Sequence, residues 1–449
     1  MLRSRWLAWA LVLLLGLPLL WAWGSRLQPQ PAASDPVRRI PAGQRSVPLG
    51  LRVQLLADPA PDAAPGSRGC HAIAQFPEGR TELQFNPCPP LQQGWWLEVH
   101  GELRRPKPAA HPLLAGPAER LARQGVWSQL RVEHWQLLSR PATPIADLRR
   151  RMAQALLKRG GADAGGVLAA LVLGSAVAPV PQAVREAFRV SGLSHALAAS
   201  GFHLTVLLGA VMAFGRFAPP PLRWLLAASA MGLFLLLAGP QPSVVRAVLM
   251  GAIAFAISES GRRVRPLGVL AVCVVALVLL IPSWLLDVGF QLSVAATAGL
   301  LLSATPLEAA LAQWMPRWSA TAVAVPLAAS LWTLPLQLLH LGSLPLYAVP
   351  ANLLVAPLLS PLTLGAMAMA VAAVLLPALL TPLAWLLVPL TRLLLWLVQL
   401  LAALPMAQWQ LGKVSPWLVL LLSLGLLPWL LPAPRWRWLL GRRSGIVLV

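Results

Sequence analysis

The residues best suited to chemistry in this chain open an apolar stretch that begins at position 191. Residues 191–203 read SGLSHALAASGFH and hold two histidines, three serines and two glycines. A helix that crosses a bilayer incurs a cost for every polar group that it buries in lipid. We therefore predict a break at Ser200 and Gly201 that lets His203 face a polar interior instead of lipid.

Three further apolar stretches carry polar residues beside glycine or proline. They are GPQPSVVR at 239–246, DVGFQLS at 287–293, and a stretch that runs from Thr333 through His340 to Pro357. A single polar residue in a membrane helix more often joins two helices than serves a pathway. Four clusters together favour a functional interior. The residues that we predict to line or brace it are His195, Ser200, His203, Arg246, Asp287, Gln291, Gln337 and Asn352, with Arg246 and Asp287 as a candidate ion pair.

Hydrolytic and metal chemistry fit this pattern poorly. Ser194 beside His195, and Ser200 near His203, suggest an intramembrane serine protease, but adjacent helical residues point about 100° apart. No G-x-S-x-G motif is present, and the two histidines lack a clear third and fourth metal ligand. We predict no catalytic residues, no metal and no cofactor. The chain also has no P-loop, so it cannot itself supply ATP-driven force.

Composition indicates a polytopic membrane protein. Hydrophobic residues make up 57% of the chain, and charged residues make up only 11%. The net charge is +21, and nearly all the cations are arginines. A basic chain favours anionic partners such as nucleic acid or lipid headgroups, but much of the excess also fits the positive-inside rule.

The N-terminal third divides into an anchor and a polar domain. Arg3 and Arg5 precede an apolar run at 6–23, and no small-x-small cleavage site follows closely, so residues 1–24 are predicted to be an uncleaved anchor. Residues 25–145 are predicted to form a small extracytoplasmic β-barrel of OB-like type. Its alternating segments lie at 49–56, 81–85, 95–103 and 126–138.

Two cysteines of this polar domain form a candidate disulfide. Cys70 and Cys88 lie 18 residues apart. In an exported domain such a pair can be oxidised, and the alternative is a pair of free thiols. We predict the bridge, provided that the domain lies outside the cytoplasm.

A basic amphipathic helix is predicted at 146–159, ended by Gly160 and Gly161. It either lies on the membrane surface or packs on the small domain. With the short segments that follow, it makes a connector over residues 146–190.

The remainder is predicted to be an α-helical membrane domain over 191–432, followed by a basic tail at 433–449. With the anchor, the apolar runs give about ten spans, at 192–214, 222–238, 243–258, 266–281, 285–304, 320–340, 346–375, 379–403 and 415–432. The prolines in the run at 346–375 suggest a broken or re-entrant segment. Arginines concentrate in alternate loops, which predicts that both termini are cytoplasmic.

At four of these stretches the chain strongly resembles the ComEC family of competence DNA-uptake channels. The matching segments are SGLSHALAASGFHLTVL (191–207), GPQPSVVRAVLM (239–250), LLDVGFQLSVAATAGLLL (285–302) and TLPLQLLHLGSLPLYAVPANLLVAPL (333–358). They match in order and spacing, so the resemblance covers about residues 165–405. It implies a channel in the bacterial inner membrane that passes single-stranded DNA into the cytoplasm during transformation. Such a channel implies membrane lipids, a DNA receptor outside, an ATP-driven motor protein in the cytoplasm and a possible homo-oligomer as partners.

Two departures from the family pattern limit what the resemblance implies. The family usually reads SGLH where this chain has SGFH at 200–203, which keeps the histidine. Many members carry a metallo-β-lactamase-like domain at the C-terminus, but no H-x-H-x-D-H motif occurs here, so we do not carry that domain's nuclease activity over. A small-solute or lipid-precursor transporter, or a homologue that no longer moves DNA, would also explain a polar interior.

Overall fold

The computed structural model describes residues 31, 35–41, 43–62, 68–108, 116–412 and 414–426. The chain divides into two compact units, and the boundary between them falls between Arg151 and Met152. The predicted anchor at 1–24 and the predicted basic tail at 433–449 lie outside the described residues.

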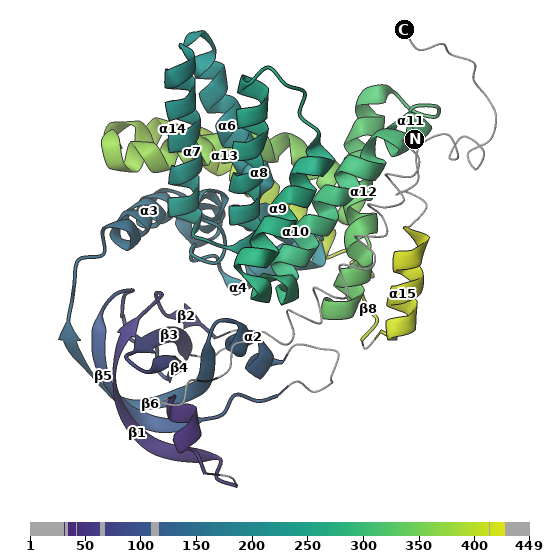
Figure 1. The fold of residues 1–449 in the computed structure, drawn as a ribbon. Coiled ribbons are helices and arrows are strands. Elements are labelled where there is room, and N and C mark those ends of the chain that lie inside the picture. Colours follow the sequence, from purple (N-terminus) through teal and green to yellow (C-terminus); the bar gives the residue numbers. More distant parts are fainter. Residues whose placement is uncertain are drawn as a thin grey trace. The chain divides into compact units, whose positions relative to one another are not determined.

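The first unit is a closed five-stranded barrel. Its strands are β1 (Ser46–Leu55), β3 (Cys70–Phe76), β4 (Gly79–Phe85), β5 (Trp96–Arg104) and β6 (Val126–Ser139), and the short β2 (Ala60–Pro61) pairs with β3. Strand β1 pairs with both β3 and β5, and the parallel pair of β4 and β6 completes the ring (Figure 1). Three consecutive strands followed by one that returns beside the first make a Greek key, the arrangement of OB folds. The prediction of a small barrel is confirmed.

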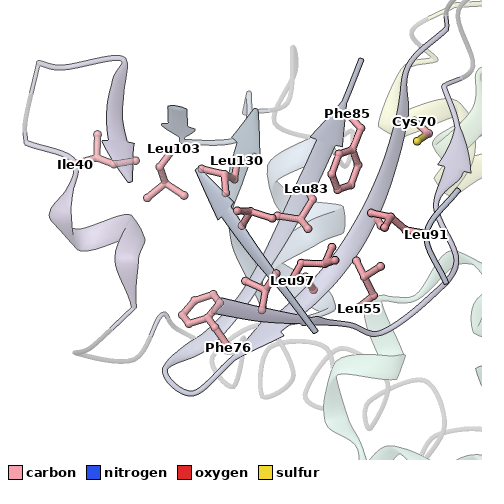
Figure 2. Packing of buried hydrophobic residues seen from close by; sticks show 14 residues of the cluster. Ile40, Leu55, Cys70, Phe76, Leu83, Phe85, Leu91, Leu97, Leu103 and Leu130 are labelled. Carbon is pink, nitrogen blue, oxygen red and sulfur yellow. The ribbon is translucent and has the colours of Figure 1, made fainter. Parts of the chain in front are cut away.

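Alternation along the strands builds the barrel core. In β4 the residues Thr81, Leu83 and Phe85 are buried, and the residues between them are more exposed. Figure 2 shows Leu83, Leu97 and Leu130 among the side chains that pack together inside the barrel. Each fully buried leucine contributes roughly 1.5–3 kcal/mol, so the unit has a core of its own.

Strand β3 is not among the predicted segments because its alternation is weak. The segment CHAIAQF buries two alanines and a cysteine where the neighbouring strands bury leucines. In the structure Cys70 of this strand forms a disulfide with Cys88, which follows β4. A short 3-10 helix (Pro36–Arg39) and α2 (Pro117–Arg123) complete the described elements of the unit.

The predicted amphipathic helix is the first part of α3 (Pro144–Leu173). The helix is interrupted at Gly161, whose φ of 76° is a left-handed value that glycine adopts without strain. Arg150 forms a 2.9 Å ion pair with Asp58 of the barrel unit. Its guanidinium also binds Asp147 and lowers the pKa of that carboxyl. These contacts favour packing of the helix start on the small domain.

The second unit is helical. Its helices are α4 (Gln182–Val190), α5 (Ser194–Leu197), α6 (Gly201–Phe214), α7 (Pro220–Ala238), α8 (Pro242–Glu259), α9 (Pro266–Leu280), α10 (Val288–Gly299), α11 (Thr305–Leu311), α12 (Arg317–Leu341), α13 (Ala348–Leu375), α14 (Leu380–Ala402) and α15 (Pro416–Gly425). A π-helical segment (Leu300–Ala304) joins α10 to α11, and short 3-10 helices lie at Gly215–Phe217, Pro282–Leu286 and Pro377–Leu379.

Two short strands tie connections of this unit together. Strand β7 (Ser343–Pro345) lies between α12 and α13, and β8 (Gln408–Gln410) lies between α14 and α15. They pair antiparallel, and the amides of Leu411 and Gly412 both donate to the carbonyl of Gly342.

Six of the described helical segments are long and apolar enough to cross a membrane. They are Pro220–Ala238, Pro242–Glu259, Val288–Leu311, Arg317–Leu341, Ala348–Leu375 and Pro377–Ala402. Two more apolar segments, Gly201–Phe217 and Pro266–Leu280, are shorter. A multi-pass membrane protein is confirmed, and the count of about ten spans stays a prediction.

The expected break in the run at 346–375 does not occur. Helix α13 is continuous over 28 residues although Pro357 and Pro361 lie inside it. Membrane helices tolerate proline because neighbouring groups satisfy the freed carbonyls.

Candidate functional site

The apolar stretch at 192–214 is interrupted where the sequence predicts a break. Helix α5 ends at Leu197 and α6 begins at Gly201, with Ala198 and Ser200 in extended conformations. The hydroxyl of Ser243 donates to the carbonyl of Ala199, and the amide of Ser175 donates to that of Leu197. A chain break at membrane depth needs such partners for its backbone groups.

His203 faces the inside of the helical unit. Its side chain is only 1% exposed, and its Nδ1 is hydrogen bonded to Ser200 Oγ at 3.0 Å. Its Nε2 is buried and has no hydrogen-bond partner among the described residues. Phe202, the residue that departs from the family pattern, places its ring edge-to-face against the imidazole, with centroids 5.5 Å apart.

Arg246 is buried beside this break. It is 5% exposed, and its Nε donates to Ser293 Oγ of α10 at 3.0 Å. Its Nη1 contacts the sulfur of Met250 at 3.7 Å. A Cβ placed on Gly201 would lie 3.8 Å from its Nη2, so the start of α6 passes close to the guanidinium.

The expected ion pair between Arg246 and Asp287 is not formed. Within the described part of the chain, Arg246 has no carboxylate partner at ion-pair distance. Asp287 instead occupies the N-cap of α10, where its Oδ1 accepts a 2.8 Å hydrogen bond from the Phe290 amide. Aspartate is favoured there because it satisfies an unpaired amide of the first helical turn.

Gln291 and His340 join α10 to α12. The Oε1 of Gln291 and the Nε2 of His340 are 2.8 Å apart, and the Gln291 amide donates to the carbonyl of Leu285. Gln337 does not join this contact, because its amide donates to Thr333 within the same helix.

His195 lies in α5 and is exposed, and Asn352 lies in the first turns of α13. The Asn352 amide donates to the carbonyl of Ala348 in the same helix. A Cβ on Gly192 would lie 2.7 Å from that of Ala348, and Gly192 has a φ of +79°. Glycine at this position therefore permits the close approach of the chain at Gly192 to α13.

These contacts link four helices in order. Gly201 on α6 lies by Arg246 of α8, Arg246 binds Ser293 of α10, and Gln291 of α10 binds His340 of α12. Ser293 is not among the residues predicted from the sequence, although it closes the DVGFQLS motif as a polar residue within an apolar helix. The result is a polar interior with a buried cation that lacks a carboxylate partner among the described residues, an arrangement that attracts anions.

A multi-pass helical unit with this interior, joined to a five-stranded Greek-key barrel, defines the class of the protein as a polytopic membrane protein with a separate small β-domain. A family model described as Competence protein matches residues 171–436, more than half of the chain. The chain belongs to the Competence protein family, and the resemblance inferred from its motifs is confirmed.

A curated relative agrees with this assignment. ComE operon protein 3 of Bacillus subtilis (strain 168) is 28% identical over 276 residues, which cover 60% of this chain and 34% of the relative. The chain thus spans about a third of the length of the curated relative that it matches. No solved structure matches the chain.

Proposed function

We propose that the chain is a channel of the bacterial inner membrane that passes single-stranded DNA into the cytoplasm during natural transformation. Membership in the Competence protein family supports the process. The observation that supports passage of DNA through the membrane is the burial of Arg246. Its guanidinium lies among α6, α8 and α10 and is bound by a hydroxyl and a thioether. Such a cation suits the phosphates of a passing strand.

A conducting path must bind its cargo without retaining it. The side chains that bind Arg246 in the described interior, Ser293 and Met250, are both neutral. One buried arginine with neutral neighbours attracts a phosphate less strongly than a cluster of arginines does. The weaker attraction lets the strand leave the site, as passage through a channel requires.

The proposal includes partners and an orientation. Both termini would face the cytoplasm and the barrel would face the outside, where a DNA receptor delivers the strand. Because the sequence has no P-loop, an ATP-driven motor protein in the cytoplasm would supply the force. A homo-oligomer is compatible with this arrangement.

Deletion of the gene tests the function most directly. We expect transformation with added DNA to be lost, and to return when the intact gene is supplied on a plasmid. Growth and conjugation, which do not need this uptake route, should be unchanged. Normal transformation in the deletion strain would show that the chain is a transporter of another solute or a homologue that no longer moves DNA.

We further propose that the barrel unit binds single-stranded DNA weakly and without sequence preference. Over residues 25–145 the chain carries 14 basic and 9 acidic residues, so the domain is cationic. Of four candidate tryptophans, Trp95 packs against the core and lies under the Arg140 guanidinium, and Trp96 and Trp127 are half-buried. Trp135 of β6 is the most exposed, at 42%, and its ring can stack on a base.

Binding by the isolated barrel unit should fall steeply as salt rises. The Trp135→Ala variant should weaken binding about tenfold, since stacking on one base is worth about 1–3 kcal/mol. Leu138→Ala is the matched control, because Leu138 is 43% exposed on the same strand and has no aromatic ring. Fluorescence anisotropy with a labelled oligonucleotide measures both. No binding at low salt, or equal binding by the two variants, would contradict this role.

A further inference from the structure

A second polar feature of the helical unit lies away from the residues discussed above. A cavity of about 350 Å³ opens between the interruption of α3 and the second half of α14. Its lining includes Asp163 from α3 and Arg392, Trp396 and Gln399 from α14.

On α14 the cavity is lined by the exposed Arg392, Trp396 and Gln399 and by the buried Leu395. Trp385, Arg392, Trp396 and Gln399 recur at helical spacing, and the opposite face of α14 is buried. Arg392 has no hydrogen-bond or ion-pair partner in the described part of the chain. A charged arginine on a helix this apolar requires a counter-charge when lipid surrounds it.

The α3 side of the cavity supplies the opposite charge. Asp163 is exposed and, within the described residues, also lacks a partner. The cavity therefore presents one cation and one anion that do not pair with each other. A wholly anionic ligand would meet repulsion from Asp163, whereas a zwitterion can satisfy both groups.

The sequence of α3 places the cavity at a polar-to-apolar boundary. Lys158 and Arg159 come just before the interruption at Gly161, and the helix from Ala164 to its end is buried and apolar. Trp396, 57% exposed, is the type of residue found at membrane interfaces. Figure 1 shows α14 running across the direction of α7 and α8.

From this geometry we propose that the cavity binds the phosphoethanolamine headgroup of a membrane phospholipid. The phosphate faces Arg392, the ammonium faces Asp163, and Trp396 with Leu395 flanks the apolar part of the lipid. The volume lies within the range of small-molecule sites.

Native mass spectrometry of the full chain tests the proposal. The detergent-purified protein is titrated with phosphatidylethanolamine or with phosphatidylglycerol of the same acyl chains, and bound lipid is counted. We expect retained phosphatidylethanolamine in the wild type and about a tenfold weaker retention in Arg392→Gln, because a hydrogen bond to a charged group is lost. Arg263→Gln is the matched control, since Arg263 is an exposed arginine in the α8–α9 connection. It should bind as the wild type does.

The Asp163→Asn variant separates the two charges of the ligand. We expect it to lose the preference for phosphatidylethanolamine over phosphatidylglycerol while still binding lipid through Arg392. Equal retention by Arg392→Gln and wild type would overturn the proposal. So would a wild-type preference for phosphatidylglycerol, or displacement of the lipid by a short oligonucleotide. Size-exclusion elution of each variant shows that the fold is retained.

Discussion

Replacing Arg246 with alanine should lower transformation at least about tenfold while the protein keeps its normal abundance in the membrane. The loss is expected because a buried cation of the proposed path is removed, and an interaction with a charged group is typically worth about 1.5–3 kcal/mol. Abundance should persist because the contacts of Arg246 are Ser293 and Met250, so its removal leaves no buried carboxylate without a partner. Transformation frequency and an immunoblot of the membrane fraction measure the two effects.

Two control variants sharpen this test. Arg263→Ala removes an exposed arginine between α8 and α9 and should transform normally. Asp287→Asn keeps an N-cap side chain on α10 and should also transform, since Asp287 caps the helix and does not pair with Arg246. Normal transformation by the Arg246 variant, or failure only because the protein disappears, would show that Arg246 has only a structural role in joining helices.

Loss of the disulfide should have the second large effect. The Cys88→Ser variant should lower the free energy of unfolding of the barrel unit by about 3 kcal/mol, the value typical for a closed loop near this length. The bridge joins residues 18 apart in a domain with one small core, so the unlinked chain gains much conformational freedom when it unfolds. Denaturant unfolding followed by tryptophan fluorescence measures the change.

The oxidation state of Cys70 and Cys88 also tests whether the barrel unit lies outside the cytoplasm. Non-reduced peptides from membranes should contain the linked Cys70 and Cys88, and alkylation of intact cells should leave both unmodified. Cys273→Ser is the control, because that buried thiol belongs to the helical unit and should not alter barrel stability. If both thiols of the barrel react freely in intact cells, the exported position of this domain is wrong.

Much of the fold of this chain could be predicted from local sequence patterns. Four strands were predictable from alternation, and the break at Ser200 followed from the cost of polar groups in lipid. Strand β3 could not be predicted in this way. The alanines at its inward positions differ too little in hydrophobicity from the outward His71 and Gln75. In α13 the prolines suggested a break, but the helix is continuous through Pro357 and Pro361.

Pairing between distant residues was harder to predict than the polar clusters themselves. Opposite charges made Arg246 and Asp287 the obvious pair, yet the start of α10 offered Asp287 a backbone amide close in sequence. Gln291 and His340 lie 49 residues apart, and only the packing of α10 against α12 brings them together. Charge and motif identify which residues are unusual, whereas helix packing decides which of them touch.

The β7–β8 ribbon has a mechanical consequence for any opening of the path. It fastens the α12–α13 connection to the α14–α15 connection by main-chain hydrogen bonds, which do not depend on side-chain identity. The helix ends at that ribbon must therefore shift together. Helices α6 to α10 are joined in the described structure by connections without strands, so main-chain pairing of this kind does not fasten their connections to one another. Arg246 and His203 lie on these helices, whereas His340 and Asn352 lie on the two helices that flank β7 of the ribbon.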